Sequence, residues 1–330
     1  MSLTKWMISG LLVSGLLASI TTSFIACDGD EGLAPLKTRA ITIDHGGFAF
    51  DGTTCAARTT RGEAVVLLHG FPQTWHSYKS TAERLCEEGY RVLAFNQRGY
   101  SAGARPTEPG DYVIENLVAD LFGVTTAAGL EKFHLVGHDW GAIVSWEAAM
   151  RDEQKRILSL TAISAPPRYA YMEDESGSGM AYIQRILAPS EEGGPAIDKY
   201  YDAEGQPKDP LKSQLLNGFN DEEKLNRQIS LLDAEMLDAG MHWYRAIPLA
   251  PPVPPAIIGV RTLFIWGDAD HNIKADLANL AGNYVEPEAF TRVVIKGAGH
   301  WIPDLSTDGP DGLHTHLLTH LRKGTPGQHE

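Results

Sequence analysis

The sequence predicts an α/β domain with a mostly parallel sheet, helices on both faces of that sheet and an inserted helical lid. Residues from about 40 to 165 alternate short apolar, strand-like runs with helical patterns, which is typical of strands joined by crossover helices. The same alternation returns from about 258 to 322, after a polar, helix-rich segment from about Arg168 to Ile257. With 330 residues, 43% of them hydrophobic, the chain can bury one large core that carries such an insertion.

We therefore expect a core formed by residues 40–167 and 258–330, and a lid formed by residues 168–257. The lid ends in a proline-rich run, 251–255, which suits a stiff return to the sheet. The formal net charge of −14 repels phosphate backbones, so a nucleic-acid partner is not expected. Neither a phosphate-cradling loop nor a metal-ligand motif stands in the sequence, and we expect no cofactor and no metal.

The most informative motif is Gly137-His138-Asp139-Trp140-Gly141, which lies between a strand-like run and a helical pattern. In this pattern a strand turns sharply into a helix through five residues: a small residue, any residue, the nucleophile, any residue and a second small residue. The turn exposes the side chain of the central residue at the top of the sheet. Asp in a loop before a helix is usually an N-cap. The residues described next favour a nucleophilic role for Asp139 instead.

A carboxylate at this position narrows the class of substrate. Attack of a carboxylate on an acyl carbon would give a high-energy anhydride, whereas attack on an sp³ carbon gives a stable alkyl ester on the enzyme. Water must then attack the carboxyl carbon of Asp139 itself. The motif therefore favours epoxides or alkyl halides over esters and peptides.

Two later strand-like runs, 261–266 and 292–296, end at the remaining members of a catalytic triad. Polar residues just past the carboxyl ends of parallel strands share one edge of the sheet. We expect His300 to activate water and an acid to orient its imidazole. Asp270 is favoured over Asp268 as that acid, because it stands three residues past the glycine at the strand end, as the acid usually does in this arrangement.

An earlier strand-like run, 64–68, ends in His69-Gly70-Phe71-Pro72. We expect the backbone N–H groups of Phe71 and Trp140 to stabilise the oxyanion that forms when water attacks the ester. Substrate contacts are assigned to His69, Phe71, Trp140 and Trp301. His69 is also expected to brace the loop, and His138 to pack behind the turn.

Together, GHDWGA, HGFPQTW, QRGY and GAGHW resemble the α/β-hydrolase-fold epoxide hydrolases, from about Ile41 to Leu321. The four motifs occur in the order of that family, each at an expected strand end. The resemblance implies a mostly parallel sheet of about eight strands with a helical cap, and hydrolysis of epoxides to vicinal diols without a cofactor.

The resemblance also implies two lid tyrosines that protonate the epoxide oxygen. Tyr182 fits the first position, because Pro189 follows it after six intervening residues. Tyr244 fits the second, within His242-Trp243-Tyr244-Arg245. Four other tyrosines compete for these roles: Tyr169, Tyr171, Tyr200 and Tyr201.

Two other functions stay open. Haloalkane and haloacid dehalogenases use the same kind of Asp nucleophile, with N–H donors for the departing halide. Trp140 could supply one donor, but Phe71 stands where haloalkane dehalogenases usually have a second. A non-catalytic, lipid-tethered binding protein is disfavoured by the complete set of Asp139, His300 and Asp270.

The N-terminus, residues 1–27, resembles a bacterial lipoprotein signal peptide: Lys5, an apolar run from Trp6, and small residues before Cys27. We expect export to the periplasmic or extracellular face, a lipid on Cys27 and a tether over residues 28–39, with ordinary cleavage or an uncleaved anchor as alternatives. The other cysteines, Cys55 and Cys86, could form a disulfide or remain buried thiols.

Overall fold

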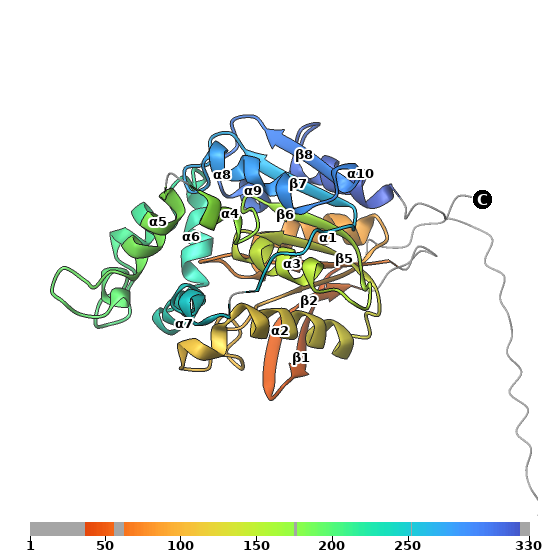
Figure 1. Cartoon of the computed structure of the whole chain (residues 1–330). Coiled ribbons are helices and arrows are strands. Elements are labelled where there is room, and N and C mark those ends of the chain that lie inside the picture. Colours follow the sequence, from red (N-terminus) through yellow and green to blue (C-terminus); the bar gives the residue numbers. More distant parts are fainter. Residues whose placement is uncertain (1–36, 56–62, 175–176, 252, 324–330) are drawn as a thin grey trace, which may run out of the picture. The chain divides into compact units, whose positions relative to one another are not determined.

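In the computed structural model, which describes residues 37–55, 63–174, 177–251 and 253–323, eight strands form one sheet in the order β1-β2-β4-β3-β5-β6-β7-β8 (Figure 1). This confirms the predicted fold class. The strands are β1 (Arg39–His45), β2 (Phe48–Cys55), β3 (Ala64–Leu68), β4 (Arg91–Phe95), β5 (Phe133–His138), β6 (Ile157–Ile163), β7 (Thr262–Gly267) and β8 (Phe290–Ile295).

Strand β2 pairs antiparallel with both of its neighbours, β1 and β4, and all other neighbouring strands of the sheet pair parallel. The central strands are buried along their whole length, as β3, β5 and β7 show. Parallel strands covered on both faces read as continuous apolar runs. That is why these segments could be recognised in the sequence without an alternating pattern.

Helices cover both faces of the sheet. Alternate residues of β3 point to opposite faces: Val66 packs in the same cluster as helices α2 and α3, and Val65 in the cluster of α1 and α10. These core helices are α1 (Lys79–Glu87), α2 (Ile114–Ala127), α3 (Trp140–Met150), α8 (Ala275–Asn279), α9 (Ile302–Leu305) and α10 (Leu313–Arg322). Short helical turns join them: η1 (Trp75–Tyr78), η2 (Pro109–Tyr112), η6 (Leu280–Tyr284) and η7 (Pro287–Ala289).

The segment between β6 and β7 carries a separate set of helices (Figure 1). Two begin at aspartate caps: Asp221 accepts a hydrogen bond from the Lys224 N–H, and Asp233 from the Met236 N–H. The lid helices are α4 (Ala170–Glu173), α5 (Ser178–Leu187), η3 (Ala196–Lys199), η4 (Leu211–Leu215), α6 (Glu222–Ser230), α7 (Ala234–Arg245) and η5 (Ile247–Leu249).

A disulfide joins Cys55 of β2 to Cys86 of α1. The structure therefore favours the bonded alternative for this pair. Within the described residues, no helix is both long and apolar enough to span a membrane. The expected signal peptide, Cys27 and nearly all of the tether lie outside those residues.

Candidate active site

Asp139 stands at a sharp turn between β5 and α3, with φ of 51° and ψ of −119°. This backbone conformation is unfavourable for residues other than glycine and occurs mainly at functional sites. Flanking glycines permit the close packing that the turn requires. A Cβ atom on Gly137 would lie 2.2 Å from the carbonyl oxygen of Gly141, and one on Gly141 would lie 2.1 Å from that of Leu68.

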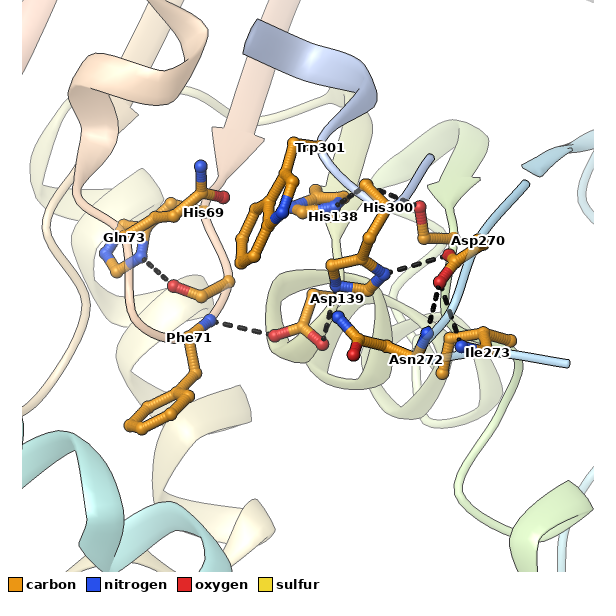
Figure 2. A network of polar contacts seen from close by, with 12 residues as sticks. His69, Phe71, Gln73, His138, Asp139, Asp270, Asn272, Ile273, His300 and Trp301 are labelled. Atoms are coloured by element: carbon orange, nitrogen blue, oxygen red, sulfur yellow. Dashed lines mark hydrogen bonds and ion pairs between the residues drawn. The ribbon is translucent and has the colours of Figure 1, made fainter. Parts of the chain in front are cut away.

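The carboxylate of Asp139 points toward the loop after β3 and toward His300 (Figure 2). Its Oδ1 accepts a hydrogen bond of 2.8 Å from the Phe71 N–H, and its Oδ2 lies 3.4 Å from His300 Nε2. The first hydrogen bond of α3 runs from the Ile143 N–H to the Asp139 carbonyl. The Trp140 N–H therefore stays outside the helix ladder, at the end of the helix that favours negative charge.

The imidazole of His300 joins two carboxylates. Its Nδ1 lies 2.9 Å from Asp270 Oδ2, and Asp270 Oδ1 accepts hydrogen bonds from the Asn272 and Ile273 N–H groups, at 2.8 and 2.9 Å. Asp268 has a different partner, the N–H of Gly297. The geometry thus brings Asp270, and not Asp268, to the histidine (Figure 2).

Burial and charge oppose each other in this group. Burial acts to lower the pKa of His300, but the carboxylates of Asp270 and Asp139 raise it to about 10. Burial acts to raise the pKa of each carboxyl, yet His300 keeps both below their usual value. The resting site therefore holds an imidazolium between two carboxylates.

Two side chains donate hydrogen bonds to the backbone carbonyl of His300. The neutral ring of His138, whose pKa burial lowers to about 4, donates from Nε2 to the His300 carbonyl at 2.9 Å. The hydroxyl of Ser164 donates to the same oxygen at 3.0 Å. Ser164 also has a positive φ of 66°. Ser164 could not be predicted from the sequence, because its only signal is its place just past β6.

Tyr244 of α7 and Tyr182 of α5 face the same site from the lid. The ring centroid of Tyr244 lies 5.0 Å from that of Phe71, 5.1 Å from that of Trp140 and 6.3 Å from that of Tyr182. Burial and the charge of Asp139 raise the pKa of both phenols. They therefore keep their protons at neutral pH and can act as hydrogen-bond donors.

The competing tyrosines differ in their surroundings. The hydroxyl groups of Tyr200 and Tyr201 are buried without a hydrogen-bond partner among the described residues. Tyr169 packs against Tyr284, with ring centroids 6.1 Å apart. Burial, and then the charges of Asp139 and Asp270, raise the pKa of the Tyr171 phenol, so Tyr171 lies near both carboxylates.

Two residues predicted to contact substrate, His69 and Trp301, form hydrogen bonds with neighbouring loops. His69 is fully buried: its Nδ1 donates to the Gly70 carbonyl, and its Nε2 accepts from the Gln97 N–H. Trp301 is also buried, and its indole N–H donates to the Asn217 carbonyl of the lid at 2.9 Å. The polar atoms of both side chains therefore hydrogen-bond to neighbouring loops, and their contact with substrate stays a prediction. Phe71 and Trp140 remain beside the tyrosines.

Among the residues that the structure describes, no three His, Cys, Asp or Glu side chains gather closely enough to hold a metal ion. The arrangement thus offers the carboxylate of Asp139, a backbone N–H at one of its oxygens, a charge-paired histidine at the other, and two phenols nearby.

The family model described as "alpha/beta hydrolase fold" matches residues 63–307. Epoxide hydrolase A of Mycobacterium tuberculosis is 27% identical over 286 residues, which cover 72% of this chain and 84% of that protein. The AB hydrolase superfamily protein YfhM of Bacillus subtilis is 30% identical over 262 residues, 75% of this chain and 87% of that protein. The crystal structure of epoxide hydrolase A from Mycobacterium thermoresistibile shares the fold, with a TM-score of 0.67 and 24% identity over 88% of this chain and 99% of that one.

Proposed function

The chain belongs to the α/β-hydrolase fold family, and within that family we propose that it hydrolyses epoxides to vicinal diols through an ester on Asp139. The observation that carries the proposal is the position of Asp139, between the Phe71 N–H and His300 Nε2. The epoxide hydrolases among its relatives support the substrate class. No cofactor is needed for either step, and the substrates are a small epoxide and water.

In the first step, Oδ2 of Asp139 attacks a ring carbon and the epoxide C–O bond breaks. The ring oxygen becomes an alkoxide, which is a poor leaving group unless it is protonated. The phenols of Tyr182 and Tyr244 supply the hydrogen bonds and one proton, leaving a tyrosinate and a hydroxyalkyl ester. Their raised pKa, set by burial, keeps them protonated until the alkoxide forms.

In the second step, conversion of Asp139 to a neutral ester lets the His300 imidazolium pass its proton to the tyrosinate through solvent. The neutral imidazole then takes a proton from water, and the hydroxide attacks the carboxyl carbon of Asp139. Oδ1 becomes the oxyanion at the Phe71 and Trp140 N–H groups, in the place where it already accepts a hydrogen bond. Collapse of this intermediate releases the diol as its oxygen takes a proton from His300. The remaining acid proton of Asp139 passes to His300, which restores the resting carboxylate and imidazolium, so one water is consumed for each epoxide.

Halide displacement is the competing function, and the phenols of Tyr182 and Tyr244 beside Trp140 speak against it. Phenols suit an alkoxide, because they can transfer a proton to it. A halide needs no proton.

The proposal is tested by trapping the ester. His300→Gln should still form the ester and hydrolyse it very slowly. The purified variant is incubated separately with aryl and alkyl epoxides and with bromoalkanes, and its intact mass and peptide masses are measured. An adduct of the whole epoxide on Asp139 supports epoxide opening. An alkyl adduct without halogen moves the assignment to dehalogenase, and no adduct from either class contradicts the proposed nucleophile.

We also propose that the protein is exported and carries a lipid on Cys27. The disulfide between Cys55 and Cys86 supports this, because such bonds persist mainly outside the reducing cytoplasm. The mass of the N-terminal peptide of protein purified from membranes tests it: a diacylglyceryl group on Cys27 is expected, and Cys27→Ser should abolish it. A peptide that begins elsewhere without lipid would indicate ordinary cleavage.

A further inference from the structure

A buried polar contact joins two active-site loops that are far apart in the sequence. The side-chain Nε2 of Gln73 donates a hydrogen bond of 2.6 Å to Oδ2 of Asp304. Gln73 is fully buried and Asp304 partly buried. Gln73 lies two residues past Phe71, and its N–H donates to the Gly70 carbonyl at 3.0 Å, which closes the loop. We call residues 69–73, which carry the Phe71 N–H, the oxyanion loop. The contact between Gln73 and Asp304 thus links this loop to α9.

Helix α9 begins two residues after His300, so Asp304 stands close to the base in the chain. The hydrogen bond between Gln73 and Asp304 therefore connects the segment that carries the Phe71 N–H to the segment that carries His300. Ester hydrolysis needs these two groups on opposite sides of one carboxyl carbon. Displacements of about 1 Å in such an arrangement cost up to about 10²-fold in rate.

The lid helix α6 binds both loops at the same place. Nε2 of Gln228 donates to the Pro72 carbonyl at 3.0 Å, and Nζ of Lys224 donates to the Asp304 carbonyl at 2.7 Å. The three segments form one junction beside the active site. Loss of the hydrogen bond between Gln73 and Asp304 would therefore allow both loops to move.

In this junction the NH₂ group of the Gln73 amide forms a hydrogen bond, but the carbonyl oxygen of the amide does not. Its Oε1 is buried without a hydrogen-bond partner among the described residues, and so is the hydroxyl of Tyr78 in η1. An ionised carboxylate is an acceptor only, so it can serve the NH₂ group of Gln73 but not its carbonyl. A protonated carboxyl has an O–H for that carbonyl. The neutral acid is therefore the better partner for Gln73.

We propose that Asp304 is a positioning residue for hydrolysis of the Asp139 ester: as a neutral acid it pairs with Gln73 through two hydrogen bonds and holds the oxyanion loop against the His300 loop. This inference rests on the proposed function. Loss of the proton leaves one hydrogen bond and a poorly solvated charge, which loosens the junction. Binding of the epoxide and attack by Asp139 do not depend on it.

The charges around Asp304 are consistent with a neutral acid near neutral pH. Burial raises the pKa of Asp304 to about 7, although the Gln73 hydrogen bond and the charges of Lys224 and Arg227 on α6 act to lower it. Tyr78 faces it from η1. The folded protein thus holds a proton that the unfolded chain, with a pKa near 3.8, releases. The contribution of Asp304 therefore lowers the free energy of unfolding progressively as the pH rises from about 3.8 to about 7.

The test compares three variants of the full chain in single-turnover experiments that resolve ester formation and ester hydrolysis. Asp304→Ala removes the pair, whereas Asp304→Asn can form both hydrogen bonds with Gln73 and cannot ionise. Asp311→Asn is the matched control, because Asp311 is exposed and has no ion pair or hydrogen bond among the described residues. We expect Asp304→Ala to slow ester hydrolysis by about tenfold or more, with ester formation unchanged.

The conservative variant distinguishes this role from simple structural support. Asp304→Asn should keep the wild-type hydrolysis rate at about pH 6 and should not show the decline that wild type shows above about pH 7. Its melting temperature should exceed that of wild type by an amount that grows between about pH 4 and 7, and this holds even if Asp304→Ala does not fold. Asp311→Asn should follow wild type in every measurement.

Two results would overturn the inference while the proposed function stands. One is an ester on Asp139 that Asp304→Ala hydrolyses at the wild-type rate. The other is an Asp304→Asn variant that keeps the wild-type pH dependence of hydrolysis and of melting. Failure of the proposed function looks different, because then no ester forms on Asp139 in the wild type or in any variant.

Discussion

His300 Nε2 lies 3.4 Å from Asp139 Oδ2, so the proposed base and the proposed nucleophile are in direct contact. In the resting protein the charge of Asp139, together with that of Asp270, raises the pKa of His300 to about 10. Attack on an epoxide turns Asp139 into a neutral ester and removes one of the two negative charges. The first half-reaction therefore lowers the pKa of the base that the second half-reaction requires.

This coupling predicts different pH dependences for the two steps. Ester formation should be flat from about pH 5 to 8, because Asp139, with a pKa below its usual value, stays ionised. Ester hydrolysis should rise between about pH 5 and 7, as the alkylated site releases the His300 proton. Stopped-flow tryptophan fluorescence of single turnovers measures both rates, with Trp140 beside the nucleophile. Ester hydrolysis that falls over this interval would contradict the account.

The lid tyrosines give the second prediction. Replacing both Tyr182 and Tyr244 by Phe should slow epoxide opening by about 10²–10⁴-fold, because the alkoxide loses its proton donors. Alkylation by a bromoalkane should change little, since bromide leaves without a proton. Tyr200→Phe is the matched control, because its buried hydroxyl has no hydrogen-bond partner among the described residues. Equal losses with both substrate classes would point to a damaged lid instead.

The parts of the site that could be predicted from the sequence are those that follow a strand directly. Asp139, His300 and Asp270 each stand within a few residues of a strand end, and parallel strands bring such ends to one edge of the sheet. The fold class followed from the same apolar runs. Tyr182 and Tyr244 came from the resemblance, because nothing local distinguishes them from the other lid tyrosines.

What could not be predicted depends on side-chain direction and on distant contacts. Ser164 and His300 are 136 residues apart, and Gln73 and Asp304 are 231 apart, so no local pattern relates the partners. The direction of the His69 ring could not be predicted for a related reason. A motif places a residue in a loop, but it does not say that both ring nitrogens turn inward. The disulfide likewise depended on a distance that only the fold supplies.

The choice between the two acids gives the third prediction. Asp270→Asn should lower turnover by about 10²–10⁴-fold, because an amide neither stabilises the imidazolium nor fixes its tautomer. Asp268→Asn, the matched control, loses only its charge opposite the Gly297 N–H, so turnover should stay near that of wild type and stability should fall by about 1 kcal/mol. Steady-state kinetics and urea unfolding measure the two effects. The reverse order of activities would reassign the acid to Asp268.

The disulfide gives the fourth prediction. Cys55 and Cys86 are separated by 31 residues in sequence, and closing a loop of that size restricts the unfolded chain by about 3–4 kcal/mol. The Cys55→Ala/Cys86→Ala double variant, and wild type under reductant, should each lose about that much free energy of unfolding. Both cysteines lie in the cluster with α1 and α10, so turnover at low temperature should persist. Unchanged stability on reduction would mean that the bond is not formed in solution.

The turn at Asp139 gives the last prediction. A Cβ on Gly141 would lie 2.1 Å from the carbonyl oxygen of Leu68, and neither backbone can move without displacing β3 or α3. Gly141→Ala should therefore cost more than about 3 kcal/mol of stability, or prevent folding. At Gly110, where a Cβ would meet nothing within 4 Å, the same change should stay within about 0.5 kcal/mol. Thermal unfolding of both variants measures the two effects. Equal stability would show that α3 can move away from β3. The close packing of the turn would then not explain the position of Asp139 beside the Phe71 N–H.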